Sequence, residues 1–120
     1  MKKIVVAGQL DKEKIAALVK EIAKDQAEIT IKEDIQAAMD MKAGLFDYYI
    51  GACNTGGGGA IAMPMALYGA VHCTTLSMPG KIKDTAEIKQ LVDEGKTVFG
   101  FTAQHAEQVI PILVPLLLAK

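Results

Sequence analysis

Positions 54–59 hold the residues whose types and spacing most clearly suggest chemistry. Asn54 and Thr55 precede four consecutive glycines, which are Gly56, Gly57, Gly58 and Gly59. Glycine loses more conformational freedom on folding than any other residue, so this run indicates a backbone that adopts positive φ angles or approaches a ligand closely. Consecutive N–H groups ahead of a helix can bind an oxyanion. The segment predicts a site for the phosphate or carboxylate of a small metabolite; the alternative is a strand-to-helix turn without a ligand.

This glycine loop differs from two common phosphate-binding motifs. No Gly-Lys-Ser/Thr follows it, as a Walker loop requires, and no acidic residue lies at the offset of a dinucleotide fingerprint. All thirteen basic residues are Lys, so the chain lacks the Arg side chain that clamps phosphate or carboxylate in a bidentate manner. We therefore expect backbone N–H groups, helix ends, hydroxyls and Lys to hold the anion, and we predict no cofactor.

Two side chains near the loop are candidate catalysts. Cys53 comes directly before it, where a helix terminus could lower the thiol pKa and make a nucleophile; the favoured alternative is a small buried core residue. His105 follows the last predicted strand and could be a general acid or base, or could simply begin a helix. A phosphatase that pairs a Cys with an Arg is disfavoured, because the chain has no Arg.

Three further side chains are candidate ligand contacts: Gln9, Ser77 and Lys81. Gln9 can donate and accept hydrogen bonds, and Lys81 could reach an anion in the glycine loop. The alternative for Lys81 is a solvated loop position. No spacing of His, Cys, Asp and Glu suggests a metal site.

Short apolar runs separated by helical periodicity must position these residues. The predicted strands are residues 3–7, 27–32, 48–53, 73–78 and 97–101, and each leads into a helix. Asp11 and Asp34 are predicted helix caps, and Asp84 with Glu87 resembles a capping box. The second helix should bury three residues, Ile35, Ala38 and Met39.

Strict alternation of strands and helices predicts an α/β fold, a three-layer sandwich around a five-stranded parallel sheet. We expect the flavodoxin-like strand order 2-1-3-4-5 and no hairpins. Ligands bind beyond the carboxyl ends of parallel strands. Nearly all candidate residues fall in loops at that edge, at positions 8–11, 33–34, 53–59, 77–81 and 102–105.

Length and composition limit the class of protein. A chain of 120 residues predicts one domain, 1–120, and 51% apolar residues are typical of a globular fold. A net charge of −1 without a basic stripe argues against a nucleic-acid partner. The basic, briefly apolar start indicates a strand and not a signal peptide, so we expect a cytoplasmic protein.

The last helix has no polar face between residues 109 and 118. One side can cover the sheet, and the other would remain an exposed apolar patch, which usually marks a partner contact. We therefore expect a homo-oligomer; docking onto a membrane protein is the alternative. The run is shorter than the ~20 residues that span a bilayer.

The segment from Gly51 through Cys53 to Ala60, together with Ser77-Met78-Pro79-Gly80, resembles the YhfU-like family of small bacterial proteins of unknown function. The likeness extends over the whole chain. It implies no activity. Family genes that lie beside transporter and hydrolase or isomerase genes imply the handling of small metabolites and contact with a membrane transporter.

Three functions remain open. The first is a binding protein for a small anionic metabolite, which we favour because no nucleophile, base and orienting group can be assembled from spacing alone. The second is an enzyme that acts on a phosphorylated or carboxylated metabolite, with Cys53 or His105 as catalyst. The third is a phosphocarrier like the IIB components of sugar uptake systems, which place their Cys after the first strand, whereas Cys53 follows the third.

Overall fold

Five parallel strands form one sheet in the computed structural model, which describes residues 1–55 and 59–120. Their bounds are β1 (Lys2–Gly8), β2 (Ala27–Ile31), β3 (Tyr48–Cys53), β4 (Cys73–Thr75) and β7 (Val98–Thr102). The order across the sheet is β2-β1-β3-β7-β4, and every neighbouring pair is parallel. Ile4, for example, is in register with Ile29 of β2 and Tyr48 of β3. The chain therefore has the predicted α/β fold.

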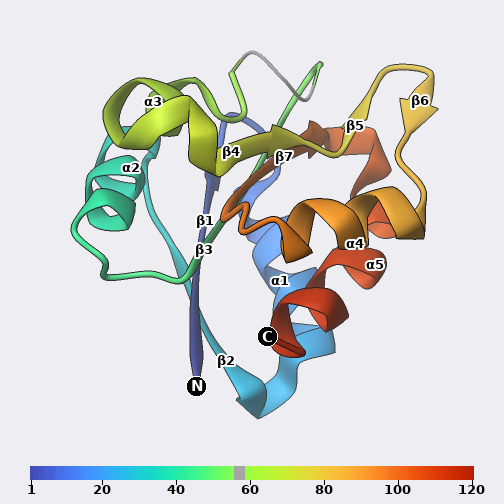
Figure 1. Cartoon of the computed structure of the whole chain (residues 1–120), viewed down its shortest axis with the longest axis horizontal. Helices are drawn as coiled ribbons and strands as arrows, with labels where there is room; N and C mark the ends of the chain where they lie inside the picture. Colours follow the sequence, from blue (N-terminus) through green and yellow to red (C-terminus); the bar gives the residue numbers. More distant parts are fainter. Residues whose placement is uncertain (56–58) are drawn as a thin grey trace.

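Helices cover both faces of the sheet (Figure 1). Their bounds are α1 (Lys12–Ala23), η1 (Lys24–Gln26), α2 (Asp34–Lys42), α3 (Ala62–Pro64), η2 (Met65–Gly69), η3 (Ala70–His72), α4 (Thr85–Asp93), η4 (Ala103–His105) and α5 (Ala106–Leu118). Helices α1, α4 and α5 pack on one face, and α2 packs with α3 and η2 on the other. Alternate residues of β1 enter the two cores: Ile4 and Val6 face α1 and α5, whereas Val5 and Ala7 face α2.

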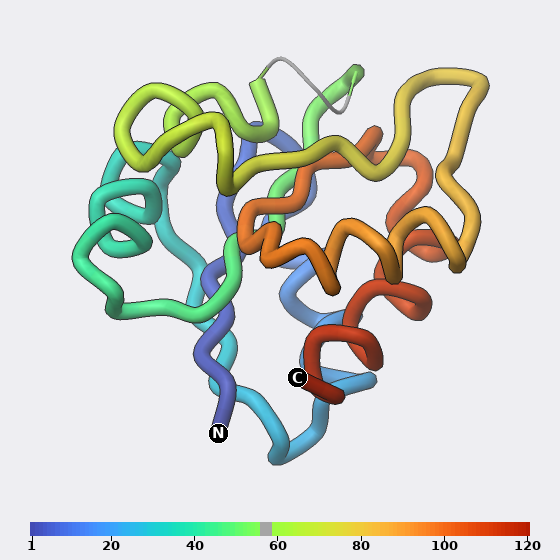
Figure 2. Tube along the Cα trace, viewed as in Figure 1, coloured from blue at the N-terminus to red at the C-terminus, as the bar shows by residue number. Residues whose placement is uncertain are grey.

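The order of the last two sheet strands differs from the prediction, because β7 lies between β3 and β4 (Figure 2). All five residues of β7 are buried, whereas β4 has three residues and two of them, Thr74 and Thr75, are only half-buried. A strand that is apolar on both faces belongs in the interior of a sheet, and a short polar strand belongs at its edge. The chain therefore crosses from β3 to the edge and returns through α4, which places α4 beside α5.

A small hairpin also departs from the expected alternation. The predicted strand 73–78 is interrupted at Leu76, and β5 (Ser77–Met78) pairs in antiparallel fashion with β6 (Lys81–Ile82). Pro79 and Gly80 form its turn, and Gly80 has φ +81°. The hairpin displaces the start of α4, which has the predicted capping box between Asp84 and Glu87.

Helix α2 is rotated relative to the prediction. Ile35 and Met39 are exposed. Ala38 is buried as predicted, together with Ala37, Asp40 and Met41. Two polar contacts explain the rotation: the Asp34 carboxylate accepts the N–H of Gly8, and Asp40 pairs with Lys32. Both contacts turn the acidic side of the helix toward the sheet edge, so Ile35 and Met39 face outward.

The apolar patch expected on the last helix is displaced to the opposite face of the molecule. The exposed side chains of α5 are Glu107, Gln108, Pro111 and Pro115, and none of the large apolar side chains most exposed in the described chain belongs to α5. Several of those side chains belong instead to α2 and η2. In the described part of the chain, no helix has the length and apolar content needed to cross a membrane.

Candidate functional site

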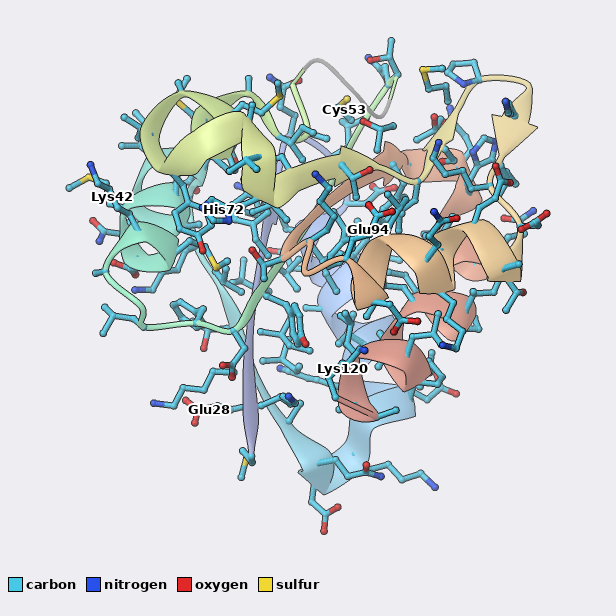
Figure 3. The ribbon with its side chains drawn as sticks, viewed as in Figure 1. Glu28, Lys42, Cys53, His72, Glu94 and Lys120 are labelled. Carbon is cyan, nitrogen blue, oxygen red and sulfur yellow. The ribbon has the colours of Figure 1, made fainter. Side chains whose placement is uncertain are left out.

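The connection after β3 leads to one face of the sheet, whereas the connections after the neighbouring strands β1 and β7 lead to the other face. The β3 connection continues into α3, which packs with α2, and the other two continue into α1 and α5. Such divergence of adjacent loops opens a crevice at the carboxyl edge of a parallel sheet. Cys53 lies at this edge, at the top of the view in Figure 3. Of the predicted ligand residues here, Asn54 and Thr55 are exposed, whereas Gly56, Gly57 and Gly58 lie outside the described residues.

On the β1 side, the backbone holds Gln9 against the end of β3. The N–H groups of Gln9 and Leu10 both donate to the carbonyl of Ala52, at 2.9 and 3.2 Å. A Cβ atom added to Gly59 would lie 2.2 Å from Cδ of Gln9, so the Gln9 amide packs directly on this glycine. Gln9 and Gly59, two predicted ligand residues 50 positions apart, are therefore in contact.

On the β7 side, hydrogen bonds join three segments that are distant in the sequence. Ser77 Oγ lies 2.9 Å from Nδ1 of His105 and accepts the backbone N–H of Thr102 at 3.0 Å. The Thr102 hydroxyl donates to the carbonyl of Thr55 at 3.2 Å. Ser77, Thr55 and His105 are candidate ligand-binding or catalytic residues in the sequence analysis above, but Thr102 has no predicted role there. Its only signal was the position of a hydroxyl residue at the end of an apolar strand.

Cys53 is deeply buried, with 2% of its surface exposed. Its Sγ lies 3.6 Å from Oγ1 of Thr55, and its neighbours are apolar residues of the α2 face. A catalytic thiolate requires a partly exposed, electropositive environment. The burial of Cys53 therefore favours the packing role over the nucleophilic one.

Lys81 is exposed at the tip of the β5–β6 hairpin. It lines a small cavity of about 90 Å³ together with Ser77 and Lys83. Two lysines at this position place positive charge in the cavity that Ser77 lines.

Cys73 and His72 lie away from this edge, before or at the start of β4. The Cys73 thiol donates to the carbonyl of Gly69 at 3.4 Å, and burial raises the thiol pKa to about 11. The His72 ring stacks on Tyr68, with centroids 4.1 Å apart. Both side chains are thus held by contacts within the fold. No group of three His, Cys, Asp or Glu side chains that could hold a metal ion occurs within residues 1–55 and 59–120.

Comparison with known proteins decides the family. Residues 2–117 match the family described as "Protein of unknown function DUF2620". The chain belongs to this family. Relatives similar in sequence include "Uncharacterized protein YhfU" of Escherichia coli strain K12 and the protein of the same name in Shigella flexneri. Each is 44% identical over 115 residues, which cover 95% of this chain and 97% of the relative. The predicted resemblance to YhfU-like proteins is thus confirmed. No solved structure matches the chain.

Proposed function

We propose that this protein binds a small metabolite that carries a phosphate or carboxylate group, at the carboxyl edge of the sheet beside the connection after β3. The observation that carries the proposal is the divergence of this connection from those that follow β1 and β7. The exposed residues Asn54 and Thr55 and the half-buried His105 lie at this edge. Binding by Gly56, Gly57 and Gly58 remains a prediction from the sequence.

Helix ends at this edge support an anionic ligand. Helices α1 and α5 begin here, and their N-cap residues, Asp11 and His105, make no side-chain capping hydrogen bond within the described chain. Asp11 is therefore not the side-chain cap that we expected. Helix α4, displaced by the hairpin, has a complete capping box. Uncapped N–H groups and the positive end of a helix dipole favour negative charge.

The Ser77–His105 contact favours one alternative, an enzyme in which His105 transfers protons. A hydrogen bond to Nδ1 fixes the orientation of an imidazole and leaves its other nitrogen for a substrate. The burial of Cys53 weighs against the phosphocarrier and against a cysteine nucleophile. Binding remains the preferred function, because the described residues near His105 include no carboxylate hydrogen-bonded to its ring.

Isothermal titration calorimetry with inorganic phosphate and with simple carboxylates tests the proposal. We expect His105→Gln and Lys81→Gln to weaken binding of the anion several-fold, because each removes a donor or a positive charge from this edge. Lys20→Gln is the matched control, since Lys20 is an exposed lysine near the far end of α1. Equal affinity in all variants, or no binding of either anion class, would refute the proposed site. Turnover of a phosphorylated or carboxylated substrate, lost in His105→Gln, would establish the enzyme instead.

A further inference from the structure

Backbone hydrogen bonds hold Ser77 in place at the end of β7. The N–H of Leu76 donates to the carbonyl of Gly100 at 2.7 Å, and the N–H of Lys83 donates to the carbonyl of Leu76 at 3.0 Å. The first bond joins the residue before β5 to β7, and the second closes the base of the β5–β6 hairpin. Ser77 is buried, so its hydroxyl makes its hydrogen bonds within the fold.

The donors and acceptors around Ser77 Oγ indicate the direction of its contact with His105. A serine hydroxyl has one proton to donate and can also accept hydrogen bonds. Oγ accepts the backbone N–H of Thr102 at 3.0 Å, and its only other partner in the described part of the chain is Nδ1 of His105, at 2.9 Å. If Nδ1 carried the ring proton, Oγ would accept both bonds, and its own buried proton would have no acceptor among these residues. Because an unpaired buried donor is costly, this balance favours a Ser77 hydroxyl that donates to Nδ1.

The other ring nitrogen of His105 is available to a ligand. A neutral imidazole whose Nδ1 accepts a hydrogen bond carries its proton on Nε2, which is then a donor. Within residues 1–55 and 59–120, Nε2 has no hydrogen-bond partner, and it is not among the buried side-chain atoms that lack one, so it is in contact with solvent. This agrees with the half-buried state of His105. The neutral side chain therefore presents an N–H group to an acceptor and cannot accept a hydrogen bond at Nε2.

We infer that Ser77 is a positioning residue: its hydroxyl fixes neutral His105 as the Nε2–H tautomer, which donates a hydrogen bond to an anionic oxygen of the ligand. The tautomer follows from contacts among described residues, whereas the nature of the acceptor rests on the proposed function. Ionised carboxylate and phosphate oxygens accept hydrogen bonds, so they fit this nitrogen; an ammonium group only donates, so it does not fit. The β5–β6 hairpin contributes to the site by placing Ser77 against His105.

Nitrogen-15 NMR of the imidazole rings tests the tautomer, because protonated and unprotonated ring nitrogens have well-separated resonances. At about pH 9, where histidine side chains are neutral, we expect Nδ1 of His105 to resonate as an unprotonated nitrogen and Nε2 as a protonated one. In Ser77→Ala both signals should move toward the average of the two tautomers, because the ring loses the donor that selects one of them. His72, which stacks on Tyr68, is the internal control and should not respond.

Thr75→Val is the matched control variant for Ser77→Ala. Thr75 is half-buried in β4 and lines the same small cavity as Ser77, but it makes no hydrogen bond to His105 in the described part of the chain. Its replacement also removes a hydroxyl from this region, and it should leave the His105 signals as they are in the parent protein.

Titration with inorganic phosphate, followed by the same NMR signals and by calorimetry, tests the acceptor. We expect Nε2 of His105 to shift as phosphate binds, while the signals of His72 stay in place. The affinity for phosphate should fall several-fold in Ser77→Ala, because part of the rings would then present an unprotonated nitrogen to the anion. Thr75→Val should bind phosphate as the parent protein does.

The outcomes separate this inference from the proposed function. A protonated Nδ1 in the parent protein would overturn the inference without the need for a variant. An unchanged His105 spectrum in folded Ser77→Ala would also overturn it, and phosphate binding in the calorimeter would then leave the proposed function standing. Phosphate binding that does not shift Nε2 would overturn the assigned acceptor. The expected tautomer without binding of phosphate or carboxylates would refute the proposed function and support the positioning role of Ser77.

Discussion

Ser77 Oγ lies 2.9 Å from Nδ1 of His105, although the two residues are 28 positions apart. The same oxygen accepts the N–H of Thr102 at 3.0 Å, so one hydroxyl joins β5 to the end of β7. Ser77 is only 3% exposed, which means that water cannot readily replace these bonds. Through Thr102 the contact continues to Thr55, and the loops after three strands are held together.

Ser77→Ala should lower the free energy of unfolding by about 1–3 kcal/mol, because it leaves the buried Thr102 N–H without its partner. Urea unfolding of Ser77→Ala, of His105→Ala and of the double mutant measures the effect. His105→Ala should cost less, since the imidazole is half-exposed and water can solvate what remains. A coupling free energy near zero in the double-mutant cycle would contradict a direct Ser77–His105 interaction.

Acid should destabilise the protein partly through Asp40. Hydrogen bonds from Lys32 and then Gln36 lower the pKa of this buried carboxyl below its usual value of 3.8. A group with a lowered pKa in the folded state stabilises the protein above its unfolded pKa, and this stabilisation is lost as the pH falls through the folded pKa. At pH values below about 4, the free energy of unfolding should therefore decrease.

Urea unfolding between pH 2 and pH 6, a range set by the ordinary pKa of Asp of about 4, measures this dependence. In Asp40→Asn the acid-dependent loss should be smaller than in the parent protein, and Lys32→Gln should also reduce it by removing the cation. An unchanged pH dependence in Asp40→Asn would show that other carboxylates account for the acid effect. Asp93 is the next candidate, since Lys120 and Lys89 lower its pKa to about 2.

Self-association, if it occurs, should use the α2–η2 surface and not α5. Met39 and Leu67 are 53% and 38% exposed, and they line a shallow cleft with Lys42 and Ala43. Lys42 lies on the outer side of α2 (Figure 3). Clustered exposed apolar side chains usually mark a protein contact. We expect Met39→Glu to lower the mass seen by sedimentation velocity, because it would bury an unpaired charge in the interface.

Val71→Glu is the matched control for this experiment. Val71 is 74% exposed in η3, outside the α2–η2 cleft, so its replacement should leave the assembly intact. A parent protein that sediments as a monomer at every concentration would contradict the expected homo-oligomer. Dissociation caused by both substitutions would place the contact elsewhere.

The sequence by itself determined the fold class, the positions of β1, β2, β3 and β7, and the edge at which candidate residues gather. These follow from local patterns: the periods of 2 and 3.6 in apolar residues, glycine and proline at turns, and the Asp84–Glu87 capping box.

Only the tertiary structure decided the strand order and the rotation of α2. The place of β7 depends on how deeply Val98–Thr102 is buried compared with β4, and the rotation of α2 depends on the contacts of Asp34 and Asp40 with β1 and Lys32. The contact of Ser77 with His105 is another such case, since the two residues lie in different loops. These features arise from contacts between residues far apart in the chain, and no local pattern encodes which distant group a side chain will meet.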